Sequence, residues 1–321
     1  MQSPSGQGPV WPGSDNQRLQ LTQDRLQPVV DRYIEEHQLG PVFSERVGPL
    51  YLPMAEWIAR QHTVNTPLFV GINGGQGSGK STLTGLLEKI LPLGFDKRVV
   101  SISIDDLYHD RATRLQMAKD THPLFVTRGV PGTHDTEYGL RLFELLKNNS
   151  GTSIHIPRFD KAIDDRLPES EWKCCALPVD IVLFEGWCVG ARPQADDALT
   201  VPVNSLEQDE DPKAVWRRTV NQHLADDYRA WFEFIDVLII LAVPSMEQVY
   251  EWRGLQEDRL QASTSQPDAS GIMDRDGLRR FIMHYERLTR HQLKDMPSYA
   301  DVYLPLDEHH QIADVIIRQP T

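Results

Sequence analysis

The feature that most constrains the fold of this chain is a glycine-rich stretch between an apolar run and an amphipathic segment. Residues 67–73 read PLFVGIN, residues 74–79 read GGQGSG, and Lys80 and Ser81 follow directly. The apolar residues further on recur at the spacing of one helix face: Leu83, Leu86, Leu87, Ile90 and Leu91. The stretch therefore predicts a buried strand that turns through a glycine loop into a helix, as α/β folds do.

The glycine loop has the composition of a phosphate-binding loop. Gly74, Gly79, Lys80 and Ser81 satisfy the pattern G-x-x-x-x-G-K-[ST]. Glycines let backbone N–H groups turn inward around phosphate oxygens, and the helix N-terminus adds partial positive charge. We expect Lys80 to reach the β- and γ-phosphates of ATP and the Ser81 hydroxyl to ligate Mg²⁺. The predicted nucleotide-binding residues are Gly74, Gly75, Gln76, Gly77, Ser78, Gly79, Lys80, Ser81 and Thr82.

Strand-like apolar runs alternate with helical patterns along the rest of the chain. The runs lie at 98–104, 179–185, 237–243 and 300–306. They are apolar on both faces, which is typical of parallel strands covered by helices on each side. The sequence therefore predicts an α/β fold with a doubly wound, mainly parallel sheet of the P-loop NTPase type.

The chain divides into three predicted parts. Residues 1–18 are rich in Gly, Pro, Ser and Gln and are expected to be disordered. Residues 19–66 carry apolar residues at helix spacing, which predicts a helical N-terminal extension. Residues 67–321 form the P-loop domain.

Composition excludes several classes of protein. A net charge of −13 over 321 residues argues against duplex DNA or an anionic membrane as a partner. Three cysteines, two of them adjacent, form neither a disulfide framework nor a zinc-ligand pattern. The N-terminus lacks the pattern of a secretory signal, and no apolar run reaches the ~18 residues of a membrane span. We expect a cytoplasmic protein, and the oligomeric state stays open.

Carboxylates follow two of the predicted strands. Asp105 and Asp106 come after the run at 98–104, and Glu185 closes the run at 179–185. If these strands lie beside the first one, the carboxylates face the γ-phosphate, because ligands bind at the carboxyl ends of such strands. We expect Asp105 to act as a base and Glu185 and Asp106 to lie on the metal side, although either aspartate could be the base.

Two further segments carry candidate acceptor-binding residues. TRGVPGTHD, at 127–135, and IPRFDKAIDDR, at 156–166, are rich in basic side chains. Such side chains suit a small anionic acceptor with a hydroxyl group, although pairing with aspartates inside the same loop is an alternative. The candidates are Arg128, His134, Arg158, Lys161 and Arg166.

The order of these segments resembles one family. GINGGQGSGKST, SISIDDLY, RGVPGTHD, IPRFDK, VLFEGWCVG and VYEWRGLQE follow one another as in the D-glycerate 3-kinase family, and the C-terminal part looks like a bacterial branch. The wider group includes uridine kinase, pantothenate kinase and phosphoribulokinase. The resemblance implies that 67–321 is a P-loop kinase domain in which Asp105 is the base and Glu185 is linked to Mg²⁺. It also implies a basic helical lid, for which Arg253 is the candidate that would act on the transferring phosphoryl group.

The prediction is an ATP-dependent kinase that phosphorylates a hydroxyl of D-glycerate. A kinase of the same fold for pantothenate, a nucleoside or a sugar phosphate is an alternative, because basic side chains favour any anionic acceptor. A nucleotide-dependent regulator is a second alternative. No N-K-x-D segment for reading guanine is present in the sequence, and a regulator has no need of a base at Asp105.

Overall fold

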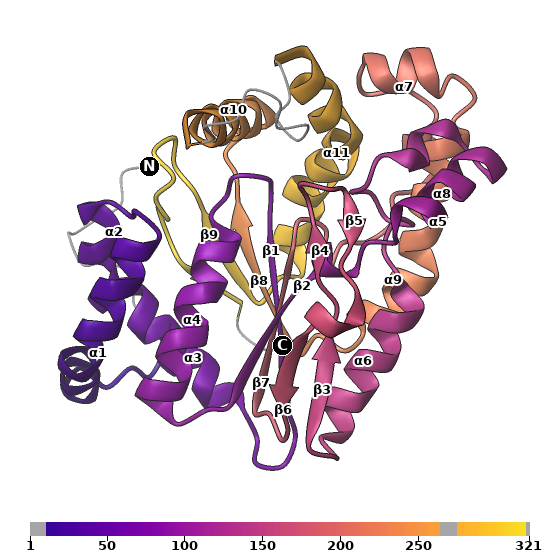
Figure 1. Cartoon of the computed structure of the whole chain (residues 1–321). Coiled ribbons are helices and arrows are strands. Elements are labelled where there is room, and N and C mark those ends of the chain that lie inside the picture. The colour runs from indigo at the N-terminus through magenta and orange to yellow at the C-terminus, as the bar shows by residue number, and fades with distance from the viewer. Residues whose placement is uncertain (1–10, 264–274, 319–321) are drawn as a thin grey trace.

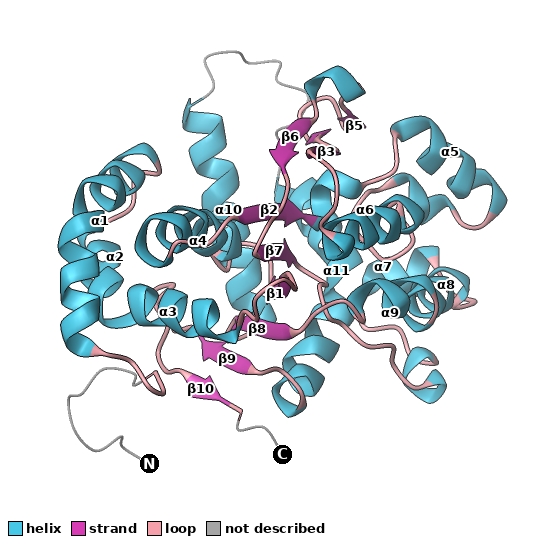
Figure 2. Cartoon of the chain, turned by 90° about the horizontal axis from the view of Figure 1, so that it is seen from below, coloured by secondary structure: helices cyan, strands magenta, loops and turns pink. Residues whose placement is uncertain are grey.

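The computed structural model describes residues 11–263 and 275–318. In this part of the chain, six strands form the central sheet in the order β10-β9-β8-β1-β7-β2 (Figures 1 and 2). All neighbours pair in parallel except β10, which is antiparallel to β9. The strands are β1 (Leu68–Gly74), β2 (Val99–Ser103), β7 (Ile181–Gly186), β8 (Val237–Ala242), β9 (Val302–Pro305) and β10 (Ile316–Ile317). The predicted doubly wound, mainly parallel α/β fold is confirmed.

Helices cover both faces of this sheet. Seen from below, α1 to α4 lie on one side of it, and α6, α8 and α9 lie on the other (Figure 2). The first group is α1 (Asn16–Glu36), α2 (Pro41–Arg46), α3 (Leu52–Gln61) and α4 (Lys80–Phe95). The second group is α6 (Thr136–Asn148), α8 (Val215–Ala225) and α9 (Asp227–Phe232).

The remaining elements lie around the carboxyl end of the sheet and its margin. Helices α10 (Met246–Ser263) and α11 (Arg275–Asp295) lie above the ends of β1 and β8 (Figure 1). Two short helices are α5 (Arg111–Asp120) and α7 (Ser205–Glu210). Two small antiparallel pairs join β3 (Ser153–Ile156) to β6 (Lys173–Ala176) and β4 (Phe159–Asp160) to β5 (Asp165–Arg166).

Strand β1 is buried along its whole length because its residues alternate between two cores. Leu68, Val70 and Ile72 join the core formed with α1, α3 and α4. Phe69 joins the opposite core, where its ring contacts Phe143 of α6 at 5.2 Å between centroids. Successive side chains of a strand point to opposite faces of the sheet, so an apolar strand packs against helices on both faces.

The N-terminal segment is ordered earlier than the sequence analysis expects. Helix α1 begins at Asn16, where the Asp15 carboxylate caps the backbone N–H groups of Gln17 and Arg18. Trp11 is buried, with an exposed fraction of 2%, and its ring lies 5.7 Å from that of Trp57 in α3. Disorder is therefore the wrong expectation for residues 11–18, because the Trp11 indole packs against α3 and Asp15 caps the start of α1. Residues 1–10 lie outside the described part of the chain.

Sheet order decides where the acidic side chains lie. Strand β7 pairs directly with β1, so Glu185 lies opposite Ile72. Strand β2 is one position further out, with Ser103 opposite Glu185. The expectation that both strands lie beside β1 holds for β7 alone. Asp105 must therefore reach the centre from a short 3₁₀ turn, Ile104–Leu107, that follows β2.

Candidate active site

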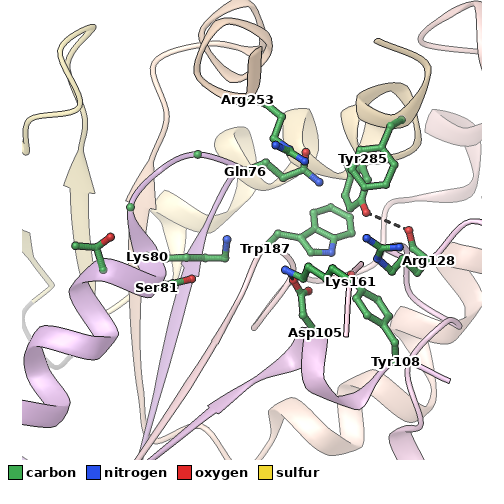
Figure 3. A pocket seen from close by; sticks show the side chains of 14 residues that line it. Gln76, Lys80, Ser81, Asp105, Tyr108, Arg128, Lys161, Trp187, Arg253 and Tyr285 are labelled. Atoms are coloured by element: carbon green, nitrogen blue, oxygen red, sulfur yellow. Dashed lines mark hydrogen bonds and ion pairs between the residues drawn. The ribbon is translucent and has the colours of Figure 1, made fainter. Parts of the chain in front are cut away.

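A cavity of about 340 Å³ opens at the carboxyl end of the sheet, beside the glycine loop (Figure 3). Lys80 enters it from one side and Lys161 and Arg128 from the other, while Arg253 lies above (Figure 3). The lining residues are Gln76, Gly77, Gly79, Lys80, Ser81, Thr82, Asp105, Tyr108, Arg128, Lys161, Trp187, Arg253, Phe281 and Tyr285. The structure thus gathers predicted nucleotide-binding, basic and acidic residues around one space.

The glycine loop has the geometry of an anion cradle. Gly77 and Gly79 have positive φ angles of 79° and 85°, which side chains rarely adopt. A Cβ on Gly74 would lie 2.4 Å from the Ser78 hydroxyl oxygen, so that position has no room for one. Helix α4 then starts at Lys80 without a side-chain cap on its first N–H groups. Those N–H groups can bind phosphate oxygens, as expected of a helix N-terminus.

The side-chain oxygens of Ser81 and Glu185, predicted as metal ligands, lie side by side at the start of α4. The Ser81 hydroxyl donates to Glu185 Oε1 at 3.1 Å. Glu185 Oε2 is buried and has no hydrogen-bond partner among the described residues. Such a carboxylate fits Mg²⁺, which takes one or two protein ligands and completes its shell with phosphate and water oxygens. A cluster of three or more acidic, histidine or cysteine ligands is absent from the described residues.

Asp105 is the carboxylate that faces the cavity. Its Oδ2 accepts a hydrogen bond from Lys161 Nζ at 2.6 Å. Burial alone would raise its pKa, but the ammonium groups of Lys161 and Lys80 outweigh burial and hold the pKa of Asp105 well below its usual range. Asp105 is therefore ionised at neutral pH and can accept a proton.

Asp106 lies outside the cavity lining, although it is the next residue. Its Oδ1 accepts from the Phe159 backbone N–H at 3.2 Å. Burial, only partly offset by that hydrogen bond, raises the pKa of Asp106 to about 6, and the charge of Asp105 adds to the rise. The structure thus gives Asp106 a contact with β4 outside the lining, and its expected place on the metal side stays a prediction.

The predicted acceptor residues separate into two groups. Lys161 and Arg128 line the cavity, whereas Arg158 is exposed and lies outside the lining. Arg166 also lies outside it, because its guanidinium donates to the Tyr108 carbonyl at 2.8 Å and to Asp135 at 3.1 Å. Arg166 supports the turn that carries Asp105, and its carboxylate partner comes from the other segment, 127–135, and not from its own loop.

His134 lies behind the cavity wall. Its ring stacks on Tyr108 at 4.4 Å between centroids, and its Nδ1 lies 2.5 Å from the Tyr228 hydroxyl. Burial lowers the pKa of His134 to about 3, so the ring is neutral. It braces Tyr108, which lines the cavity, and does not itself reach the lining.

Arg253, the candidate for a lid residue, lines the cavity, and its lid role stays a prediction. It lies on α10 directly above Gln76 of the glycine loop (Figure 3). The preceding residue, Trp252, is buried and packs near Gly77.

The aromatic side of the cavity was not predicted. Trp187 Nε1 donates to the Gly129 carbonyl at 2.9 Å, and the Tyr285 hydroxyl donates to the Arg128 carbonyl at 3.1 Å. These bonds anchor the backbone on either side of the Arg128–Gly129 bond, and Figure 3 shows the second of them. Tyr285 fits the apolar period of α11, so the sequence carries no signal that separates it from core residues.

Comparisons with known proteins place the chain in a family. No family model matches it. An uncharacterized kinase of Schizosaccharomyces pombe, mug58, is 35% identical over 227 residues, which cover 68% of this chain and 78% of that protein. The chain belongs to the P-loop kinase family that includes D-glycerate 3-kinase. This kinase is thus a phosphotransferase with a hydroxyl group as acceptor, and its relatives imply the use of ATP.

Further relatives agree with this assignment. The chloroplastic D-glycerate 3-kinase of Arabidopsis thaliana is 26% identical over 80% of this chain, which spans 57% of the plant protein's length. A solved D-glycerate 3-kinase structure from Cryptococcus neoformans superposes with a TM-score of 0.66 at 23% identity, covering 87% of this kinase and all of that chain. The relatives named here come from fungi and a plant, so they give no support to the expected bacterial branch.

Among the described residues, none of the helices combines the length and apolar character that crossing a membrane requires. The expected cytoplasmic location stays a prediction.

Proposed function

We propose that this kinase transfers the γ-phosphoryl group of Mg-ATP to a hydroxyl of D-glycerate. The observation that carries the proposal is the charge of the cavity, where four basic side chains accompany one carboxylate, that of Asp105, among the described lining residues. The basic residues are Lys80, Arg128, Lys161 and Arg253. Such a space suits a small anion that carries a hydroxyl group. The names of the plant and fungal relatives support D-glycerate as that anion.

In the proposed reaction, Asp105 is the base. It accepts the proton of the acceptor hydroxyl while that oxygen bonds to the γ-phosphorus and the bond from phosphorus to the β–γ bridging oxygen breaks. ADP leaves with the electron pair of the broken bond. Asp105 is ionised at neutral pH, as a base must be, although the nearby Lys161 and Lys80 lower its pKa and so weaken it as a base.

The remaining residues stabilise charge and exclude water. Lys80 and Arg253 face the transferring phosphoryl group from two sides, so they offset the charge that spreads over its oxygens. Mg²⁺, when bound by Ser81 and Glu185, supplies further positive charge at the phosphates. Helix α10 above the loop limits access of water, which would otherwise compete with the acceptor.

Another small anion is the alternative acceptor. Pantothenate kinase from Streptococcus pneumoniae is 26% identical over 53% of this chain. The basic cavity would also suit pantothenate or a sugar phosphate, so the acceptor must be decided by experiment.

The deciding experiment is ADP release from Mg-ATP with D-glycerate, L-glycerate, pantothenate, uridine and ribulose 5-phosphate as separate acceptors. We expect turnover above background with D-glycerate alone. Turnover with a different acceptor would contradict the proposed substrate and leave the kinase assignment intact.

A further inference from the structure

We propose that Lys161 caps the base of this kinase: its ammonium group pairs with Asp105 until an acceptor binds, and then pairs with the acceptor instead. In the structure, the Lys161 ammonium occupies one carboxylate oxygen of Asp105 at 2.6 Å. This inference rests on the proposed function, because it assigns Asp105 as the base and an anion as the acceptor. It adds a positioning role for Lys161, which moves from Asp105 to the acceptor carboxylate.

The ion pair is built to be exchanged. The Lys161 side chain is 60% exposed and that of Asp105 is 27% exposed, so water reaches both partners. Solvent screens the ammonium charge at the exposed Lys161 side, and the flexible lysine side chain must be held in place to keep the pair. An incoming carboxylate in the same cavity can therefore compete with Asp105 for the ammonium group.

The backbone below Lys161 is held firmly, so the exchange needs only side-chain movement. Lys161 lies in the turn between β4 and β5, and the far end of this turn is clamped at Asp164. Arg114, which is fully buried, donates to the Asp164 carbonyl at 2.6 Å and pairs with its carboxylate at 3.1 Å. Arg128 pairs with the same carboxylate. The turn that carries Lys161 is thus held in place at Asp164, while the Lys161 side chain itself is 60% exposed.

The exchange would distinguish the acceptor from water. While Lys161 binds Asp105, the carboxylate is a weaker base, and a water molecule near the γ-phosphate is poorly activated. When the acceptor carboxylate draws Lys161 away, the basicity of Asp105 rises beside the acceptor hydroxyl. Binding of the correct substrate thus completes the catalytic arrangement, which is a known way to limit wasteful hydrolysis.

The test compares Lys161→Met, Lys161→Arg and the wild-type protein. We expect Lys161→Met to raise ADP release without acceptor by about tenfold and to raise the acceptor KM more than it changes kcat, as loss of a binding contact does. Lys161→Arg should keep the low background, because a guanidinium can still pair with Asp105. Lys119→Met, an exposed lysine on α5, is the matched control and should change neither quantity.

The outcomes separate the cap from a simple binding role. A higher KM with unchanged acceptor-free ADP release would overturn the cap. Added hydrolysis that persists in Lys161→Met with Asp105→Asn would also overturn it, because the released base would not be its cause. Titration with a fluorescent ATP analogue shows whether each variant still folds a nucleotide site. If D-glycerate is not the acceptor, acceptor-free ADP release still decides the role of Lys161.

Discussion

At the scale of single residues, two neighbouring aspartates acquire different chemistry from their surroundings. Asp105 lies between Lys161 and Lys80, which hold its pKa well below its usual range. Asp106 is buried against the Phe159 backbone, and burial raises its pKa to about 6. Their order in the chain cannot separate them, but the charges around them do.

This difference leads to a prediction for the base. Asp105→Asn should lower kcat by about 10²–10⁴, because general base catalysis contributes that range, while nucleotide affinity is kept. Asp106→Asn is the matched control, since an amide oxygen can still accept from Phe159, and kcat should fall by less than about tenfold. Steady-state kinetics and a nucleotide titration measure both effects. Equal losses in kcat would remove Asp105 from the role of base.

At the scale of elements, the glycine loop and α10 depend on each other. Gly77 has a φ of 79°, and a Cβ there would lie 3.0 Å from the Trp252 Cβ of α10. Gly79 has a φ of 85°, but a Cβ there would meet no described atom within 4 Å. One glycine therefore shapes the loop alone, and the other also allows α10 to approach it.

A pair of alanine variants can separate these two roles. Each should cost roughly 1–2 kcal/mol of backbone strain, because alanine rarely adopts a left-handed conformation. Gly77→Ala should raise the dissociation constant for ATP more than Gly79→Ala, since it also displaces α10 and Arg253. Calorimetric titration with ATP measures the difference. If Gly79→Ala proves equally harmful or worse, contact between the loop and α10 does not matter for nucleotide binding.

At the scale of the whole molecule, the N-terminal extension shares a core with the sheet. Leu26 and Val30 of α1 belong to the same buried cluster as Ile72 of β1 and Leu87 of α4. The Tyr33 hydroxyl also donates to the Thr82 carbonyl at 2.8 Å, so α1 contacts the first turn after the phosphate loop. The boundary predicted at residue 66 therefore does not separate two hydrophobic cores, because residues on both sides of it pack in the same core.

One consequence is that the extension and the sheet should unfold together. Leu26→Ala should lower the free energy of unfolding by about 2–5 kcal/mol, because it leaves a cavity in the shared core. Leu21→Ala, on the exposed side of the same helix, should change it by less than about 0.5 kcal/mol. Circular dichroism and tryptophan fluorescence should follow one urea transition in each variant. Two separated transitions would show that the extension folds as its own unit.

The sequence alone determined the fold class, the phosphate loop and the family. These features are local or periodic. The pattern of a strand, a glycine turn and a helix lies within the 25 residues 67–91, and apolar runs predict the later strands. Local patterns could also suggest that basic residues gather at 127–135 and 156–166. Local patterns could not indicate which of these side chains line the cavity, because a loop has no regular spacing that assigns residues to one face.

The tertiary structure alone decided how the candidate residues divide. Sheet order puts β7 beside β1 and β2 beyond it, so Glu185 meets Ser81 while Asp105 meets Lys161. The tertiary structure also places the Arg166 guanidinium against the turn that carries Asp105, and it brings Tyr285 to the cavity wall. Each of these contacts joins segments more than 50 residues apart in the chain. They depend on packing between distant elements, and no spacing within one segment encodes that packing.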